Sequence, residues 1–395
     1  MDGVNSKKLT FLYSLIQGAY WMLFAIVSGL ASVYLLGCGF ASHTVGIMIA
    51  VAGGITAVLQ PVLTTYADLP QAPSIRRMAG VFAVLAILLS LALYLTHGQS
   101  LLLTCVLFCG CYILLLLLMP FVNALGTEFA EGSPRPDWGI ARGIGSLAYA
   151  GIASLLGWAV AQVGVISIPI SMAAVYGLLL LGLCLYPFRK ITIEKKPAAS
   201  AVRGGFLKRY PSFLLLLCGM AVLYTSHVMN TTYLYQIVLS RGGGSAENGN
   251  IMSLCALVEL PALFLFSLLL KKWHCETLYR VAAVFMALKA LGMLLSPSVG
   301  WLYGAQLFQA LGWGLIAIVP VHYVKKVIPE EDAIKGQGYM AMTNTLANAI
   351  GSLAGGWLID LSGVQTMMIF SASCGALGAV LVLLGIRRQS SGIGT

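Results

Sequence analysis

Twelve runs of apolar residues, each long enough to cross a lipid bilayer as a helix, follow one another along this 395-residue chain. A spanning helix needs about 20 mostly apolar residues, so little of the sequence remains for anything else. Hydrophobic residues make up 59% of the chain and charged residues only 9%, which excludes a soluble globular protein. We therefore predict an all-α membrane protein. The twelve predicted transmembrane helices are residues 9–37, 43–67, 77–96, 100–126, 140–162, 167–187, 211–240, 248–270, 277–297, 300–324, 337–361 and 364–386.

The basic residues fall in every second connection between these helices. Twenty-one of the 23 Lys and Arg residues lie in such segments, and the exceptions are Arg241 and Lys289. Because basic loops stay on the cytoplasmic side, both termini are predicted to be cytoplasmic in a cell membrane. The segments are residues 1–8, 68–77, 127–142, 188–210, 271–280, 325–336 and 387–395. The net charge of +10 thus indicates orientation, and we expect no nucleic-acid partner.

The longest of these connections divides the chain into two halves. Residues 188–210 hold seven Lys and Arg and form a basic cytoplasmic linker between an N-terminal six-helix half, residues 1–187, and a C-terminal half, residues 211–395. Contact with anionic lipids is a second interpretation of this charge. The topology alone already accounts for it.

Polar residues are concentrated in eight of the twelve helices. Helices 3, 6 and 12 carry almost no polar residues, and helix 9 carries only Lys289. The other eight have polar side chains at helical spacing, so each half consists of two three-helix repeats with the same pattern. In hydrocarbon such side chains must face the bundle interior or a water-filled cavity. Internal repeats around a polar centre are typical of secondary transporters.

Other functional classes lack their motifs. The sequence has no HExxH, GxSxG or Walker loop, so we expect neither an enzyme nor a primary pump. Its nine cysteines show no repeated CxxC spacing, and we expect no metal and no cofactor.

Two opposite charges lie at matching depth in consecutive helices. Counted along the helix, Glu259 is about 13 Å and Lys289 about 12 Å from the predicted outer ends of helices eight and nine. Protonation of the carboxylate would release the lysine, which predicts a coupling or binding role. A static structural ion pair is the alternative.

Several short motifs follow one another along the whole chain. They are Thr44-Val-Gly-Ile, Leu59-Gln-Pro61, Trp138-Gly-Ile-Ala-Arg142-Gly-Ile-Gly-Ser146, Val258-Glu259-Leu-Pro261, and Gly351-Ser-Leu-Ala-Gly-Gly356 with Asp360. In these motifs the chain resembles the major facilitator superfamily, and within it the lactose permease and the related oligosaccharide, nucleoside and phenylpropionate proton symporters. The resemblance implies two six-helix halves and alternating access.

The resemblance also suggests roles for individual residues. Glu259 and Lys289 match the family's glutamate and arginine, with His227 as a second titrating group, so these three are predicted to couple protons. Of the inward-gate motif Gly-x-x-x-Asp-Arg-x-Gly only Asp68 clearly survives, followed by Arg76 and Arg77. We expect these three to act in gating.

The solute-binding residues are predicted partly from the resemblance and partly from the polar side chains that recur at helical spacing. Arg142 matches an arginine that binds sugar hydroxyls in the lactose-permease family, and Tyr149 stands seven residues later. The family's acidic partner on helix four has no clear counterpart, since Asn123 lies near that position and Glu128 lies closer to the cytoplasm. This departure weakens a galactoside interpretation. The remaining predicted residues are Gln17, Tyr20, Asn230, Gln306, Gln309, Trp313, Asn344 and Asn348.

The sequence thus predicts a monomeric secondary transporter that couples protons to the uptake of a small polar solute. A sugar or oligosaccharide, a nucleoside and an aromatic acid all remain open, and the neutral Asn and Gln lining slightly favours an uncharged solute. Two rivals remain, a proton-coupled exporter of drugs or metabolites and a transporter-like receptor without turnover.

Overall fold

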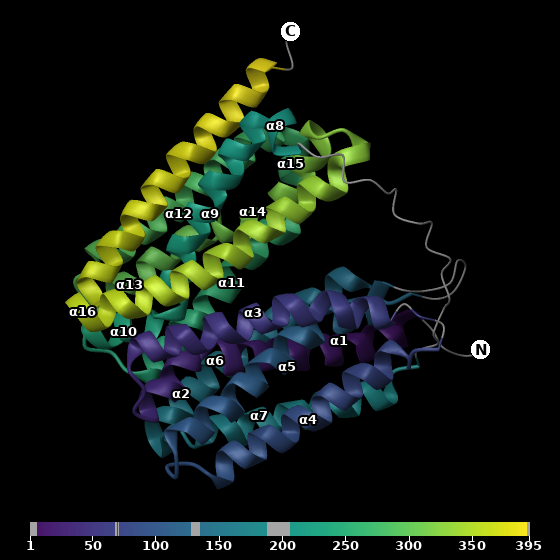
Figure 1. Cartoon of the computed structure of the whole chain (residues 1–395), viewed down its shortest axis with the longest axis vertical. Coiled ribbons are helices and arrows are strands. Elements are labelled where there is room, and N and C mark those ends of the chain that lie inside the picture. Colours follow the sequence, from purple (N-terminus) through teal and green to yellow (C-terminus); the bar gives the residue numbers. More distant parts are fainter. Residues whose placement is uncertain (1–5, 68, 70, 128–134, 188–205, 393–395) are drawn as a thin grey trace. The chain divides into compact units, whose positions relative to one another are not determined.

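The computed structural model describes residues 6–67, 69, 71–127, 135–187 and 206–392, and in this part of the chain every regular element is a helix (Figure 1). The predicted all-α fold is confirmed. Asp68 and residues 188–205 of the predicted linker lie outside the described residues.

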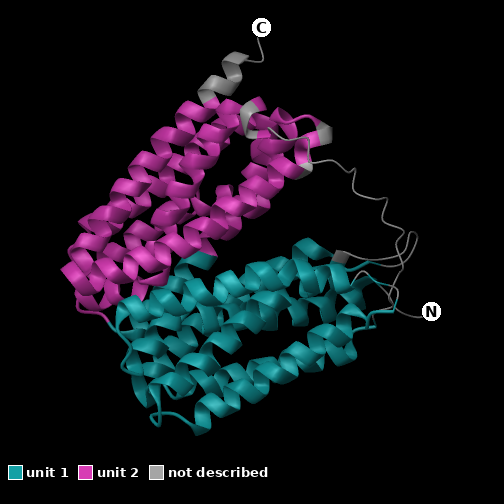
Figure 2. Cartoon of the chain, viewed as in Figure 1, with its two compact units in different colours: residues 1–196, 244–256 teal, residues 197–243, 257–395 magenta. Residues whose placement is uncertain are grey.

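The chain forms two compact units (Figure 2). Unit 1 comprises residues 1–196 and 244–256, and unit 2 comprises residues 197–243 and 257–395. Residues 244–256 belong to unit 1 because the first turns of one helix contact Gly157: a Cβ there would lie only 2.6 Å from the Ser245 carbonyl oxygen and 2.9 Å from the Gly249 Cα. Glycines at such a crossing allow two helix backbones to approach closely.

Unit 1 contains seven α-helices and one π-helical turn among its described residues. In chain order they are α1 Ser6–Leu23, the π-helical η1 Phe24–Gly29, α2 Ala31–Gly37, α3 Ser42–Ala67, α4 Ile75–Leu95, α5 Leu101–Thr127, α6 Trp138–Val163 and α7 Ser167–Leu185. Side chains begin two of these helices, because Ser74 accepts a hydrogen bond from the Arg77 amide and Asp137 accepts one from the Ile140 amide.

Unit 2 holds the remaining helices, of which α11 begins in unit 1. They are α8 Phe206–Arg209, α9 Pro211–Thr232, α10 Leu234–Ser240, α11 Ser245–Lys272, α12 Cys275–Leu295, α13 Val299–Gln306, the 3₁₀-helical η2 Leu307–Gln309, α14 Trp313–Ile316, α15 Val319–Val327 and α16 Glu330–Gly392. Within α16, Gly363 has a φ of 84°, which only glycine adopts readily, and two helices meet there.

The described residues contain eleven helical stretches that are long and apolar enough to cross a membrane. The last stretch, residues 335–386, is 52 residues long, and at 1.5 Å per residue it would extend about 78 Å, more than twice the thickness of a bilayer core. Because it is divided at Gly363, it supplies two spans. The prediction of twelve transmembrane helices is therefore confirmed.

Three of the spans are not continuous α-helices. The first passes through the π-helical η1, the seventh is interrupted at Tyr233 between α9 and α10, and the tenth consists of α13, η2, α14 and α15. These are the first helices of three of the four predicted three-helix repeats. Irregular backbone at membrane depth is tolerated where it is buried in protein or lines a cavity, so these breaks mark where a site is to be sought.

Helix α9 packs closely between the two parts of α16. A Cβ on Gly378 would lie 2.6 Å from the Leu223 amide nitrogen, and one on Gly351 would lie 3.0 Å from the Thr225 carbonyl oxygen. Ser226 and Ser371 add a buried hydrogen bond, with their hydroxyl oxygens 3.1 Å apart. The glycine-rich face of the eleventh span is thus occupied inside unit 2.

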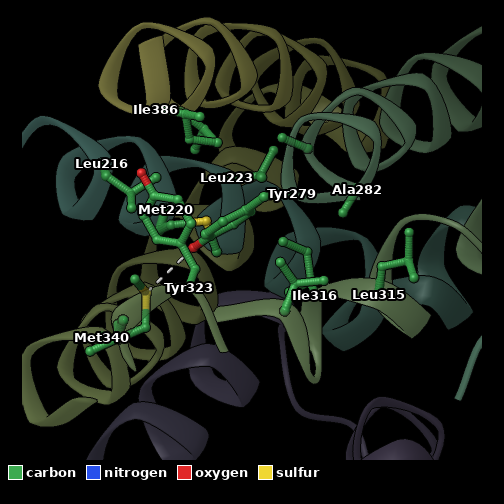
Figure 3. Close-up of a cluster of buried hydrophobic side chains, with 14 of the residues drawn as sticks. Leu216, Met220, Leu223, Tyr279, Ala282, Leu315, Ile316, Tyr323, Met340 and Ile386 are labelled. Carbon is green, nitrogen blue, oxygen red and sulfur yellow. Dashed lines mark hydrogen bonds between the residues drawn. The ribbon is translucent and has the colours of Figure 1, made fainter. Parts of the chain in front are cut away.

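Large apolar and aromatic side chains from α9, α12, α14, α15 and α16 form the core of unit 2 (Figure 3). Tyr279 lies among Leu216, Met220 and Leu223, and its hydroxyl donates a hydrogen bond of 3.7 Å to the Met340 sulfur. The core fixes α12 against the broken tenth span and so positions the polar groups described next.

Ion pairs hold the end of unit 2 where α8, α15 and the start of α16 meet. Asp332 accepts hydrogen bonds from Lys335 at 2.9 Å, Arg209 at 3.1 Å and Tyr210 at 3.3 Å. The hydrogen bond from Lys335, with smaller contributions from the other two partners, lowers the pKa of Asp332. Lys326 pairs with Glu276 at 2.6 Å.

Candidate functional site

Among the described residues, each unit contains a network of polar side chains at membrane depth. In unit 1 the centre is Gln17, which is fully buried on α1. Its amide nitrogen donates to the Tyr13 hydroxyl at 2.7 Å and to Asn123 Oδ1 at 3.3 Å, and its amide oxygen accepts from the Trp21 indole at 3.1 Å. Because both ends of this amide are bound within the protein, Gln17 positions its neighbours.

The guanidinium of Arg142 lies over the indole ring of Trp21. Its Cζ is 3.8 Å from the ring centroid, and Nη1 donates a hydrogen bond of 2.7 Å to Ser146 Oγ. Gly145 permits this close approach, since a Cβ there would lie 2.6 Å from the Trp21 ring. A guanidinium over an indole face is held there by attraction between the cation and the ring electrons.

The other predicted residues of unit 1 lie around this stack. Tyr149 is half-buried on α6, with its hydroxyl 3.2 Å from the position that a Cβ on Gly29 would occupy, at the end of η1. Tyr20 is 1% exposed, packs edge-on against Trp21, and its hydroxyl has no hydrogen-bond partner among the described residues. It therefore supports the indole from within the unit.

Two of the predicted gating residues are described. Arg76, near the start of α4, donates a hydrogen bond of 2.8 Å to the carbonyl oxygen of Tyr186, at the end of α7. The Arg77 side chain is exposed. The predicted role of Asp68 falls on a residue outside the described part of the chain.

In unit 2 three helices contribute a chain of charged and amide groups. The Lys289 ammonium on α12 donates to Gln309 Oε1 at 2.5 Å, and Gln309 Nε2 donates to Glu259 Oε1 on α11 at 2.6 Å. The sequence pattern suggested that Glu259 and Lys289 offset each other directly. The structure instead places the Gln309 amide between them, which keeps both charges hydrogen-bonded.

The break in the tenth span brings Gln309 to this position. Gln309 ends η2, and two glycines follow it, Gly312 in the turn before α14 and Gly314 inside α14. A Cβ on Gly312 would lie 3.2 Å from the Met286 amide nitrogen on α12, and one on Gly314 would lie 3.1 Å from the Ala262 Cβ on α11. On α11, Pro261 follows two residues after Glu259. A proline has no backbone N–H, so one hydrogen bond of this helix is missing there.

An aromatic stack lies beside the same turn. The His227 imidazole and the Trp313 indole are parallel, with centroids 4.0 Å apart and an interplanar angle of 9°. Tyr224 meets Trp313 edge-on at 5.8 Å. Both His227 and Trp313 are half-buried, so part of this stack is exposed in the structure.

The remaining predicted residues of unit 2 are less closely grouped. Asn230 and Gln306 are buried, on α9 and α13. Asn348 on α16 is exposed and donates a hydrogen bond of 3.0 Å to the half-buried Asn344. The solute-binding roles of these four residues stay predictions.

The sequence pattern did not reveal the breaks that shape either network. The apolar periodicity continues through η1 and through residues 307–318, so both regions look like ordinary helix. A usable signal was Gly312 and Gly314 on either side of a tryptophan, because two glycines so close together weaken a helix. Tyr13 and Ser146, which are among the polar side chains at helical spacing, also proved to be network members.

Comparison with known proteins identifies the family. The model of the MFS_1 like family, where MFS denotes the major facilitator superfamily, matches residues 13–370. The chain belongs to this family. The predicted membership of the superfamily is thereby confirmed, and the protein is an integral membrane protein.

Individual relatives are distant. A maltose permease of Geobacillus stearothermophilus is 24% identical over 186 residues, 47% of each chain. An uncharacterized MFS-type transporter of Mycobacterium tuberculosis is 26% identical over 106 residues, 27% of this chain and 18% of that protein. The chain thus spans less than half the length of these curated relatives.

Solved structures match over almost the whole chain. The nucleoside transporter NupG has a TM-score of 0.76 at 13% identity, covering 97% of this chain and 99% of NupG. A peptide transporter POT in complex with sulfate has a TM-score of 0.75 at 15% identity, covering 99% of both chains. At these identities the likeness supports the fold alone.

Proposed function

We propose that this chain is a proton-coupled symporter that takes up a small polar solute by alternating access, with Glu259 as the coupling carboxylate. The observation that carries the proposal is the hydrogen-bonded series Glu259, Gln309 and Lys289 at the break of the tenth span. An ionisable group at membrane depth, next to discontinuous helix, is the arrangement by which transporters bind ions and substrates. Glu259 is half-buried and so remains within reach of water.

Each unit is proposed to offer one aromatic surface to the solute. In unit 1 the Arg142 guanidinium lies over the Trp21 ring, and in unit 2 the His227 imidazole stacks on the Trp313 indole. Rings with polar substituents, such as sugars, nucleosides and aromatic acids, suit such surfaces. The maltose permease and NupG likenesses are compatible with a solute of this size.

The proposed placement is a cell membrane with both termini in the cytoplasm, as the distribution of Lys and Arg suggests. We further propose a monomer, since the glycines of the eleventh span, Gly351 and Gly355, already pack on α9 of the same chain. Arg76 is proposed to support the inward gate through its bond to the end of α7.

External pH reports the proposed coupling directly. De-energised proteoliposomes containing the purified chain receive sugars, nucleosides and phenyl-substituted acids in turn, and a pH electrode records the medium. Symport predicts alkalinisation with one class of solute and none with the Glu259→Gln variant. Solute uptake with a flat pH trace would remove proton coupling, and solute-driven acidification would indicate an exporter.

A further inference from the structure

We propose that the solute is a monoanion, and that Lys289 binds its carboxylate, or an equivalent anionic group, when Glu259 is protonated. This inference rests on the proposed function, because it takes Glu259 to be the proton site. The observation behind it is the number and placement of charges around Gln309 in unit 2.

Lys289 is a buried cation. Its side chain is 5% exposed, and its ammonium donates to the carbonyl oxygen of the Gln309 amide. That amide has no net charge and therefore does not neutralise the ammonium. Its N–H group donates a hydrogen bond to Glu259, whose carboxylate carries the negative charge. A buried ammonium needs such a counter-charge. In the resting site Glu259 supplies it.

The other acids of unit 2 whose side chains are described lie elsewhere. Glu276 stands almost four turns before Lys289 on α12 and pairs with Lys326, and Asp332 is bound by Lys335 and Arg209. Asp360 lies near Tyr233. None of these contacts reaches the Gln309 amide. Protonation of Glu259 therefore leaves Lys289 without compensation from this part of the chain.

The neighbouring titratable groups do not supply a negative charge either. His227 and Tyr224 face the same turn from α9 through the Trp313 ring, and neither is an anion near neutral pH. A protonated His227 would add positive charge next to Lys289. The groups facing the site from α9 and α12 thus favour an incoming anion over a neutral solute.

Charge balance then determines the transport cycle. The empty site is neutral with Glu259 ionised and Lys289 charged, and the loaded site is neutral with Glu259 protonated and one anion on Lys289. Both forms can cross between access states without carrying net charge through the low-dielectric interior. One proton moves from the medium to the Glu259 carboxylate for each anion bound, which makes the transport electroneutral.

Linkage gives the size of the expected effect. If one proton must bind before the anion, the apparent affinity of the wild-type protein rises tenfold for each unit by which pH falls, as long as pH stays above the pKa of Glu259. The Glu259→Gln variant imitates the protonated state. It should bind the anion at all pH values, with less than a twofold change between about pH 5.5 and about pH 8.

The experiment measures the thermal stabilisation of the purified full chain by three matched pairs of probes. They are acetate and acetamide, benzoate and benzamide, and glucuronate and glucose, each titrated at both pH values. Wild type, Glu259→Gln and a Lys289→Met, Glu259→Gln double variant are compared. The double variant removes both charges together, which avoids the unpaired charge that would unfold a single Lys289 variant. Glu276→Gln is the matched control for loss of one carboxylate.

The inference expects a carboxylate to stabilise Glu259→Gln at both pH values and wild type only at the lower one, while its uncharged partner has no effect. The double variant should lose this response and Glu276→Gln should keep it. Absence of any carboxylate response in both wild type and Glu259→Gln would overturn the inference, as would a response that survives in the double variant.

A flux measurement separates this inference from the proposed function. The rate of uptake of a stabilising carboxylate should increase with an imposed pH gradient and should not change with an imposed membrane potential. Proton-coupled uptake of an uncharged probe would leave the symport proposal standing and remove the monoanion. Anion uptake without proton movement would overturn both.

Discussion

Replacement of Gln309 by leucine tests whether this amide holds the charged groups of unit 2 together. The variant loses two hydrogen bonds, of 2.5 Å to Lys289 and 2.6 Å to Glu259, each to a charged group. Such bonds contribute about 1.5–3 kcal/mol each, and leucine returns only part of this through its apolar surface. We expect the free energy of unfolding to fall by about 3 kcal/mol.

This loss converts into a measurable change in melting temperature. Unit 2 has fewer than 200 residues, and for a unit of that size 1 kcal/mol corresponds to about 2–4 °C. The Gln309→Leu variant should therefore melt about 6–12 °C below wild type. A thiol-reactive dye reports the transition, because Cys275 is a free cysteine buried in unit 2.

Asn348→Leu is the matched control. It removes an amide from the same unit at an exposed position, where substitutions change stability by about 0.5 kcal/mol or less. Its melting temperature should lie within about 2 °C of wild type. If Gln309→Leu melted as high as this control, the bridging amide would not stabilise unit 2 and the reasoning would be refuted.

Three further predictions concern other parts of the chain. Gly314→Leu should push α14 away from α11 and reduce solute uptake more than tenfold, whereas Gly304→Leu, with nothing within 4 Å of its Cβ position, should transport normally in the same assay. Trp21→Leu should raise KM for the solute several-fold with little change in kcat, because it removes the ring that orients a guanidinium; an unchanged KM would argue against that surface. Asp332→Asn should speed hydrogen exchange in α8 at neutral pH. The pKa of Asp332 is lowered, so its contribution is present above the ordinary value near about 4 and is lost as pH falls through the lowered one, and α8 of wild type should loosen only in acid.

The number and order of the spans were predictable from the sequence. Each apolar run is long enough for one crossing and ends at polar or basic residues, so length and charge determine the count. Even the narrow gap between the last two helices, residues 361–364, contains the kink at Gly363. The side on which residues 244–256 pack was not predictable, because no local pattern shows which unit a helix end contacts.

The candidate site was only partly predictable. Counting along a helix placed Glu259 and Lys289 at matching depth, since depth depends on rise per residue alone, and in the structure both side chains bond to Gln309. Counting could not show that Gln309 lies between them, because the break after η2 changes which side chain faces the neighbouring helices. The Arg142 stack on Trp21 likewise depends on Gly145, whose missing side chain gives no periodic signal.

Comparison of exchange and accumulation in the Glu259→Gln variant tests the central claim most directly. Proteoliposomes loaded with a transported solute report exchange, and the same vesicles under an imposed pH gradient report accumulation. If Glu259 carries the coupled proton, the variant should exchange solute at a rate close to wild type and fail to accumulate it. Accumulation by Glu259→Gln to the wild-type level would contradict the claim and leave Glu259, Gln309 and Lys289 as a structural network.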